Sequence, residues 1–245
     1  MSAMGGKRTP SVIDWLGRRH GDGLDLLTSN TVLSRIAFAL LVSGLVVLVV
    51  SVLWGGAVYP GYDHSRQFMS ELGATGSVTG VAVNSWGYIP NGVLIAAFCL
   101  LAAIILRGNA LATIACLLLA LNGVGMAGAG IYPCDFECSR SNPTVAAELH
   151  DLWGGLGYLG GILGTVLAAL WARKSTAPWL APIAVAAAII SLVGFSGIIA
   201  EVEFAGLFQR AMETALAAFM LSLGWALMNG LTGDSAYSSA STHVT

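Results

Sequence analysis

The sequence predicts an all-α, polytopic membrane protein: a six-transmembrane-helix bundle with both termini cytoplasmic. Of its 245 residues, 56% are hydrophobic and only 10% are charged, whereas soluble domains carry about 25% charged residues. The mean hydropathy of +0.77 and the long uncharged runs exclude a soluble globular enzyme and a disordered chain. The net charge of −2 is too balanced for a nucleic-acid binder, so we expect no nucleic-acid partner.

Six apolar segments reach the length of about 20 residues that a membrane-spanning helix needs. They are Val32–Trp54, Val81–Leu106, Ala110–Tyr132, Leu149–Trp171, Ala177–Ala200 and Leu207–Leu231. All are too long and too continuous for the strands of a membrane barrel, which alternate over about ten residues. A polar segment of roughly thirty residues precedes the first span, which is therefore expected to be an uncleaved signal anchor rather than a cleavable signal peptide.

Lysines and arginines are distributed unevenly over the predicted loops. Eight of the eleven lie before or at the start of the first span, or in the turns after the second and fourth spans. Arg66, Arg140 and Arg210 lie on the other side. Because positive loops stay cytoplasmic, both termini are predicted to be cytoplasmic, in a multi-pass protein of the cell (plasma) membrane.

The two tails differ in composition from the six-helix domain, which we place at residues 32–231. In the N-terminal tail (1–31), Thr9-Pro10 is typical of a helix start. The apolar and basic residues that follow up to Arg19 suggest a short interfacial helix, with a partly ordered basic tail as the alternative. Residues 232–245 are rich in Ser, Ala and Thr and are predicted to be disordered.

Glycines in the third and fourth spans predict close helix packing, because small residues let helix backbones approach in lipid. The fourth span contains two G-x-x-x-G pairs, Gly157/Gly161 and Gly160/Gly164. Packing within the chain is the favoured interpretation. The alternative is that these glycines join a homo-oligomer or a partner membrane protein, in addition to the membrane lipids that any such bundle contacts.

Acidic residues and two histidines gather on the predicted outer face. Ionisable groups near a bilayer are costly and are functional candidates by default, although outer loops are also acidic simply because positive charge is excluded from them. In the first outer loop, a helix over residues 63–72 would place His64, Gln67 and Glu71 on one face, with Ser70 beside it. Glu148 and Asp151 similarly share a face at the start of the fourth span.

Cys134 and Cys138 lie together in the predicted outer loop after the third span, where oxidising conditions favour a disulfide. Free thiols are one alternative. A metal site is another, formed with the acids and histidines nearby: His64, Glu71, Asp135, Glu148 and His150. The tight zinc patterns H-E-x-x-H and C-x-x-C are missing, so no metal is assigned. No Walker loop, dinucleotide fingerprint or serine-nucleophile elbow occurs in a workable setting, and we predict no cofactor.

Four motifs resemble a known family. They are Ser70-Glu71-Leu72-Gly73-Ala74-Thr75-Gly76 after the first span, Tyr132-Pro133-Cys134-Asp135 after the third, His150, and Gln209-Arg210 with Glu213. Together they resemble a bacterial six-span family catalogued as domain of unknown function 998, over about residues 34–230. The resemblance implies a six-span fold and supplies no activity. The span layout is also similar to a eukaryotic six-span group involved in lipid remodelling and autophagy regulation.

Three classes of function fit these observations, and the sequence does not choose among them. The first is a membrane enzyme acting on a lipid or lipid-linked substrate at the outer leaflet, with Glu71, His150 or Asp151 as general base. The second is a binding or permease module, and the third is a structural accessory subunit. Candidate substrate-binding residues are His64, Ser70, Asp135, Arg210 and Glu213.

The sharpest expectation concerns four residues that come from four different outer segments: Glu71, Asp135, His150 and Arg210. We expect them to meet in one outward-facing polar pocket, in which Arg210 pairs with at least one of the acids. Arg210 would then be placed to bind a phosphate or a carboxylate. In the alternative, the four are separate side chains, each solvated alone.

Overall fold

The computed structural model describes residues 12–232, with side chains from residue 30 onward. Every regular element in this part of the chain is helical. In order they are α1 (Val12–Val58), the 3₁₀ helix η1 (Met69–Gly73), α2 (Gly80–Val83), the π-helical segment η2 (Asn84–Tyr88), α3 (Ile89–Ile105), α4 (Ala110–Ile131), the 3₁₀ helix η3 (Phe136–Cys138), α5 (Val145–Ala172), α6 (Leu180–Ile199) and α7 (Ala205–Met228).

The predicted all-α architecture with six membrane spans is confirmed. The apolar helices long enough to cross a membrane are Asn30–Val58, Gly80–Ile105, Ala110–Ile131, Val145–Ala172, Leu180–Ile199 and Ala205–Met228. The second span is formed by α2, η2 and α3 in direct succession. The fourth begins earlier than its apolar run predicts, because Thr144 caps it: the Thr144 hydroxyl accepts a hydrogen bond of 3.3 Å from the Ala147 N–H, which is the usual role of a threonine at this position.

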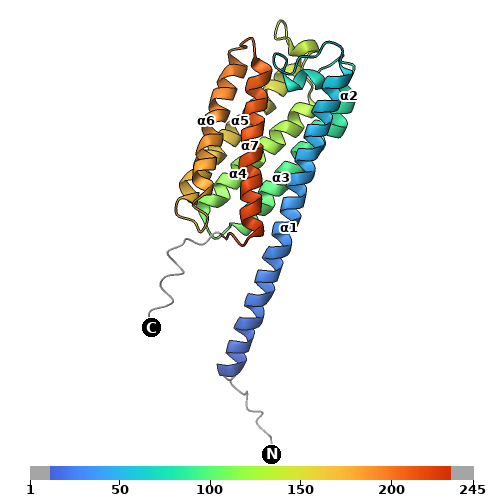
Figure 1. Cartoon of the computed structure of the whole chain (residues 1–245). Helices are drawn as coiled ribbons and strands as arrows, with labels where there is room; N and C mark the ends of the chain where they lie inside the picture. The colour runs from blue at the N-terminus through green and yellow to red at the C-terminus, as the bar shows by residue number, and fades with distance from the viewer. Residues whose placement is uncertain (1–11, 233–245) are drawn as a thin grey trace, which may run out of the picture.

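The six spans form a ring in chain order (Figure 1). Each span packs against the next, and α7 closes the ring by packing against α1. The segments 59–79, 132–144 and 200–204 lie together at one end, which we call the loop end. The short turns, the end of α7 and the projecting first part of helix α1 lie at the opposite end. Phe98, Leu180 and Phe219 are among the large side chains buried inside the ring.

The contact between α4 and α5 depends on glycine, as the sequence predicts. A Cβ on Gly125 would lie 2.6 Å from the Gly157 Cα and 2.6 Å from the Trp153 carbonyl oxygen, both backbone atoms. A Cβ on Gly160 would similarly lie 2.7 Å from the Leu118 carbonyl oxygen. No side chain fits at these positions, so the two helix backbones meet directly.

In the second span, the π-helical segment η2 ends just before Pro90. Proline cannot donate the backbone hydrogen bond that a helix interior needs, and a single π turn is a common way to absorb such an interruption. The next residue, Asn91, donates its side-chain N–H to the Gly44 carbonyl at 2.9 Å. This hydrogen bond fixes α3 to α1 below the loop end.

The N-terminal segment joins the first span without a break. α1 is one helix of 47 residues from Val12 to Val58, and the interfacial position of its first part stays a prediction. Thr9-Pro10 and the C-terminal residues 233–245 lie outside the described residues. Which side of the membrane the loop end faces stays a prediction from the distribution of Lys and Arg.

Candidate functional site

The first loop is fixed on the start of α7. The N–H groups of Gly206 and Leu207 donate to the carbonyls of Arg66 and Ser65 at 3.1 and 3.0 Å, so the loop backbone satisfies helix N–H groups that have no partner within the helix. Gly206 permits this approach, because a Cβ there would overlap the Gln67 carbonyl. Residues 64–66 form a turn, so the helix considered over residues 63–72 does not form: within that range only η1 is helical.

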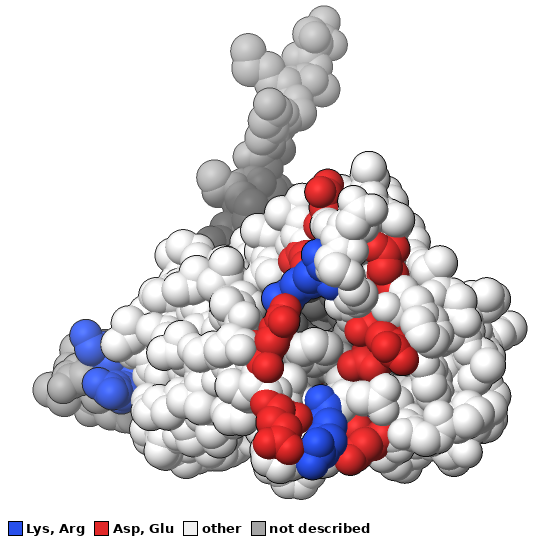
Figure 2. All heavy atoms as spheres, turned by 90° about the horizontal axis from the view of Figure 1, so that it is seen from above, with Lys and Arg blue, Asp and Glu red and all other residues white. Residues whose placement is uncertain are grey.

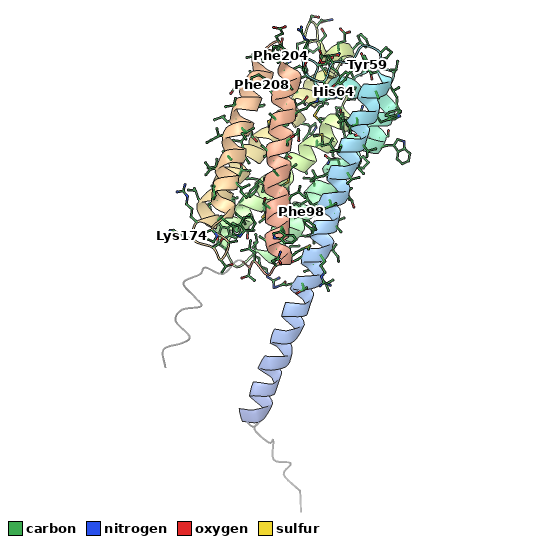
Figure 3. All side chains as sticks on the ribbon, in the orientation of Figure 1. Tyr59, His64, Phe98, Lys174, Phe204 and Phe208 are labelled. Atoms are coloured by element: carbon green, nitrogen blue, oxygen red, sulfur yellow. A yellow bond between two sulfur atoms is a disulfide. The ribbon has the colours of Figure 1, made fainter. Side chains whose placement is uncertain are left out.

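Arg210 is the second anchor of this loop. Its guanidinium donates to the Tyr62 hydroxyl at 2.7 Å, to His64 Nδ1 at 3.0 Å and to the Gln67 carbonyl at 3.0 Å. His64 lies with Tyr59 at the loop end (Figure 3). Burial and the charge of Arg210 lower the pKa of His64, and burial raises the pKa of Tyr62 to about 12. Both groups are therefore neutral at physiological pH: His64 Nδ1 accepts from Arg210, and the Tyr62 hydroxyl accepts from Arg210 while donating to the Phe68 carbonyl.

Glu71 and Gln209 complete the attachment of the loop. Glu71 is 7% exposed, and its carboxylate accepts from the Phe68 N–H at 2.8 Å and from the Gln67 side chain at 2.7 Å. Burial raises the pKa of this carboxyl group. Gln209 accepts from the Met69 N–H at 2.6 Å and donates to the Tyr158 hydroxyl at 2.9 Å. These side chains hold the loop in place, and their polar atoms are occupied in doing so.

A cavity of about 350 Å³ opens beside this loop. Its wall includes residues of η1, α4, α5, α6 and α7. Polar side chains at the loop end are Ser70, Cys138, Arg140, His150 and Asp151; apolar ones are Phe68, Met69, Met126, Phe195, Ile198 and Ile199; deeper polar ones are Asn122, Tyr158 and Gln209. On α5 the lining runs from His150 to Tyr158, which is roughly 12 Å along a helix. The cavity thus extends from the loops into the membrane-spanning part of the bundle.

His150 is held in one orientation by backbone carbonyls. Its Nδ1 lies 3.0 Å from the Ala129 oxygen and 3.0 Å from the Tyr132 oxygen. Both partners only accept, so in the neutral imidazole Nδ1 carries the proton and Nε2 carries the lone pair. That nitrogen is available to accept a proton, to accept a hydrogen bond or to bind a metal.

Cys134 and Cys138 are joined by a disulfide, with Cα atoms 5.0 Å apart. Cys134 is 3% exposed, whereas Cys138 lines the cavity. The turn between them places Glu137 and Cys138 at φ values of 56° and 46°, a region that non-glycine residues seldom adopt. Ser70 contacts both cysteines: its carbonyl is 3.7 Å from Cys134 Sγ and its hydroxyl 3.3 Å from Cys138 Sγ.

Charged side chains form a rim at the loop end. Seen from this end, acidic side chains surround the hollow with arginines between them (Figure 2). Arg140 pairs with Glu201 at 2.8 Å and with Asp151 at 3.5 Å, and Arg66 pairs with Glu203 at 2.9 Å. These pairs are about half exposed, so each contributes little to stability.

The predicted site residues do not all meet in one pocket. Ser70, His150 and Asp151 line the cavity. Glu71, His64 and Arg210 belong to the loop attachment, and the Asp135 carboxylate accepts from the N–H and the hydroxyl of Thr144 at 2.9 and 2.8 Å. Among residues 30–232, the salt bridges involve Arg66 and Arg140. The predicted pairing of Arg210 with an acid is therefore wrong: its partners are neutral.

Glu213 lies deeper in α7. Its carboxyl group interacts with the Tyr158 hydroxyl, and its Oε1 is buried without a hydrogen-bond partner. Sequence reasoning missed Tyr158, Gln209 and Arg140 as cavity residues. Gln209 stands next to Arg210 in a motif already identified and could have been included. Tyr158 carries a hydroxyl group inside an apolar, glycine-rich span, and this unusual position could have identified it as a cavity residue.

An all-helical ring of six spans with a cavity at its loop end defines an integral, multi-pass membrane protein. The chain belongs to a family described as protein of unknown function (DUF998), whose model matches residues 41–226. The match contains the first loop, the helices α4 to α6 that line the cavity, and Arg210. No curated protein and no solved structure shows significant similarity to the chain.

Proposed function

We propose that this protein binds a membrane lipid or a lipid-linked molecule in the cavity between α5 and α6. The observation that carries the proposal is the mixed lining, in which the polar side chains of Ser70, His150 and Asp151 face a wall of α6 formed by Phe195, Ile198 and Ile199. An amphipathic molecule matches a cavity with polar and apolar walls. A volume of about 350 Å³ lies within the range of small-molecule sites and fits a head group with the first part of a chain.

The wall between α5 and α6 supports access from the bilayer. Ile199 lines the cavity while 60% of its surface is exposed. On the facing helix, a Cβ on Gly154 or Gly155 would meet no atom within 4 Å. Two such open positions beside an exposed aliphatic residue leave this side of the cavity without a packed wall, which supports access for a lipid chain.

The polar end favours a head group that is zwitterionic or uncharged. Arg140 and Asp151 are the charged residues in the lining, and they pair with each other at 3.5 Å. His150 Nε2 and the Ser70 hydroxyl add a neutral acceptor and a neutral donor. A head group carrying a single net charge would have to compete with the existing ion pair.

Photo-crosslinking tests this function. The protein is reconstituted in vesicles of phosphatidylcholine with a phosphatidylcholine analogue carrying a diazirine near the head group, irradiated and digested. We expect crosslinks on the α6 peptide that contains Phe195 and Ile199. Gly155→Phe should reduce these crosslinks at least several-fold, because the new ring enters open space rather than a packed contact.

The matched control is Leu159→Phe, one turn further along α5. Leu159 is 47% exposed and lies outside the cavity lining, so this variant should crosslink like the wild type. Equal labelling in the Gly155→Phe variant would contradict the proposal and would leave a permease for a non-lipid solute or a structural subunit as the explanation of the cavity.

A further inference from the structure

We propose that Cys134, Cys138 and His150 form a binding site for a divalent metal ion of the Zn²⁺ class when the disulfide is reduced. One ligand atom from each residue lies within 4.8 Å of the others. A tetrahedral zinc ion, with bonds of about 2.3 Å to sulfur and about 2.0 Å to nitrogen, separates its ligand atoms by roughly 3.5–3.8 Å. The imidazole and the two sulfurs therefore lie within reach of one ion, and the sulfurs attain this spacing once the S–S bond is broken and they separate.

The environment of His150 is that of a metal ligand. Histidine ligands usually donate their second ring N–H to a carbonyl or carboxylate, which fixes the tautomer and the direction of the ring. His150 already does this through Nδ1, at 3.0 Å from the carbonyls of Ala129 and Tyr132. Both carbonyls belong to the end of α4 and the residue that follows it, immediately before the cysteine loop.

The fourth coordination position faces the cavity. Cys134 is buried on the protein side, whereas Cys138 and His150 both line the cavity. The Ser70 hydroxyl, 3.3 Å from Cys138 Sγ, is an oxygen donor beside the sulfurs, and water can occupy the same position. Two cysteines, one histidine and an open position make up one of the ligand sets of catalytic zinc sites.

The redox state of Cys134 and Cys138 determines whether their sulfurs can bind a metal. In the disulfide the two sulfurs are bonded to each other and provide no thiolate. A dithiol or phosphine reductant supplies two electrons, and with two protons the S–S bond becomes two thiols. Metal binding then displaces those two protons, because the thiolate is the ligand. Oxidation and metal binding are thus mutually exclusive states of one loop.

Cobalt spectroscopy tests the site in the full-length protein in detergent. After anaerobic reduction with a phosphine, titration with Co²⁺ should produce thiolate–cobalt and tetrahedral d–d absorption bands that saturate at one ion per chain. Zn²⁺ should displace the cobalt. Oxidised protein should show neither band. In the wild type, Zn²⁺ should also protect both thiols from alkylation, a measurement that requires no variant.

Substitutions identify the ligands. Cys138→Ser should abolish the thiolate–cobalt band, and His150→Gln should weaken binding by at least about 100-fold, the upper end of the loss for removing even an outer-shell partner. The matched control is the double variant Cys99→Ala and Cys116→Ala, which removes two buried thiols of the spans and should bind cobalt like the wild type.

Two results would overturn the proposal: reduced wild-type protein with alkylatable Cys134 and Cys138 but no cobalt band, or a band that persists in Cys138→Ser. The metal site does not rest on lipid binding. Because the cobalt titration contains no lipid ligand and the crosslinking experiment uses the oxidised protein, failure of one proposal leaves the other standing.

Discussion

Arg210→Ala should release the first loop from α7. The substitution removes three hydrogen bonds that join α7 to the loop, those to Tyr62, His64 and the Gln67 carbonyl at 2.7–3.0 Å. A hydrogen bond to a charged group contributes about 1.5–3 kcal/mol. The three bonds share one half-buried guanidinium and are not additive. We therefore expect the free energy of loop opening to fall by about 3 kcal/mol.

Hydrogen exchange measures this directly. The Gly206 amide donates to the Arg66 carbonyl of the loop at 3.1 Å, so it exchanges when the loop opens. A loss of about 3 kcal/mol corresponds to exchange that is roughly 100-fold faster. The α4 amides, remote from the loop, should exchange at the wild-type rate, which separates local opening from global unfolding.

Arg66→Ala is the matched control on the same loop. Arg66 pairs with Asp63 and Glu203, but its side chain is 55% exposed and those of its partners are 50% and 63% exposed, so the loss should stay below about 1 kcal/mol. The reasoning is refuted if Arg66→Ala accelerates exchange at Gly206 as much as Arg210→Ala does, or if neither variant changes it.

Two further predictions concern helix packing and pH. Gly125→Ala should lower the free energy of unfolding by about 2 kcal/mol, because its Cβ would lie 2.6 Å from backbone atoms of α5. Gly154→Ala, where a Cβ meets nothing within 4 Å, should be neutral or stabilising by up to about 1 kcal/mol. Reversible unfolding in detergent measures both changes. Burial and Arg210 lower the pKa of His64 below its ordinary 6.5, so the unfolded state binds more protons below that pH, and stability should fall as the pH drops from 6.5 through the folded-state pKa. His64→Gln keeps an acceptor for Arg210 without titrating and should reduce this slope in thermal unfolding from pH 7.5 to 5; an unchanged slope would contradict the assignment.

The spans could be predicted because the bilayer imposes one requirement on all of them, a long run of apolar residues whose backbone is satisfied within a helix. Their ends depend on single side chains and are harder to predict: Thr144 extends α5 beyond its apolar run by capping it. The glycine contact between α4 and α5 was predicted correctly because close approach in lipid has few other solutions.

The first loop could not be predicted in the same way. A helix over residues 63–72 would have placed His64 and Glu71 on one face. In the structure, carbonyls of this segment cap α7, and Arg210 and Gln209 bind its turns. Partners that lie about 140 residues away in sequence decide its conformation. The sequence pattern within residues 63–72 therefore says little about the conformation of this loop. The expected ion pair of Arg210 with an acid was wrong because the partners of Arg210 are also set by distant parts of the chain.

The glycines of α5 have two structural roles, close packing against α4 and open space in the cavity. Gly157, Gly160 and Gly164 bring the helix against α4, where a Cβ would meet backbone or side-chain atoms. Gly154 and Gly155, one turn nearer the loop end, meet nothing and line the cavity. Close packing in the lower part fixes the position of α5, and missing side chains in the upper part leave space next to His150. The same residue type thus holds the bundle together and leaves its cavity open, and which of the two it does depends on what the neighbouring helix places opposite.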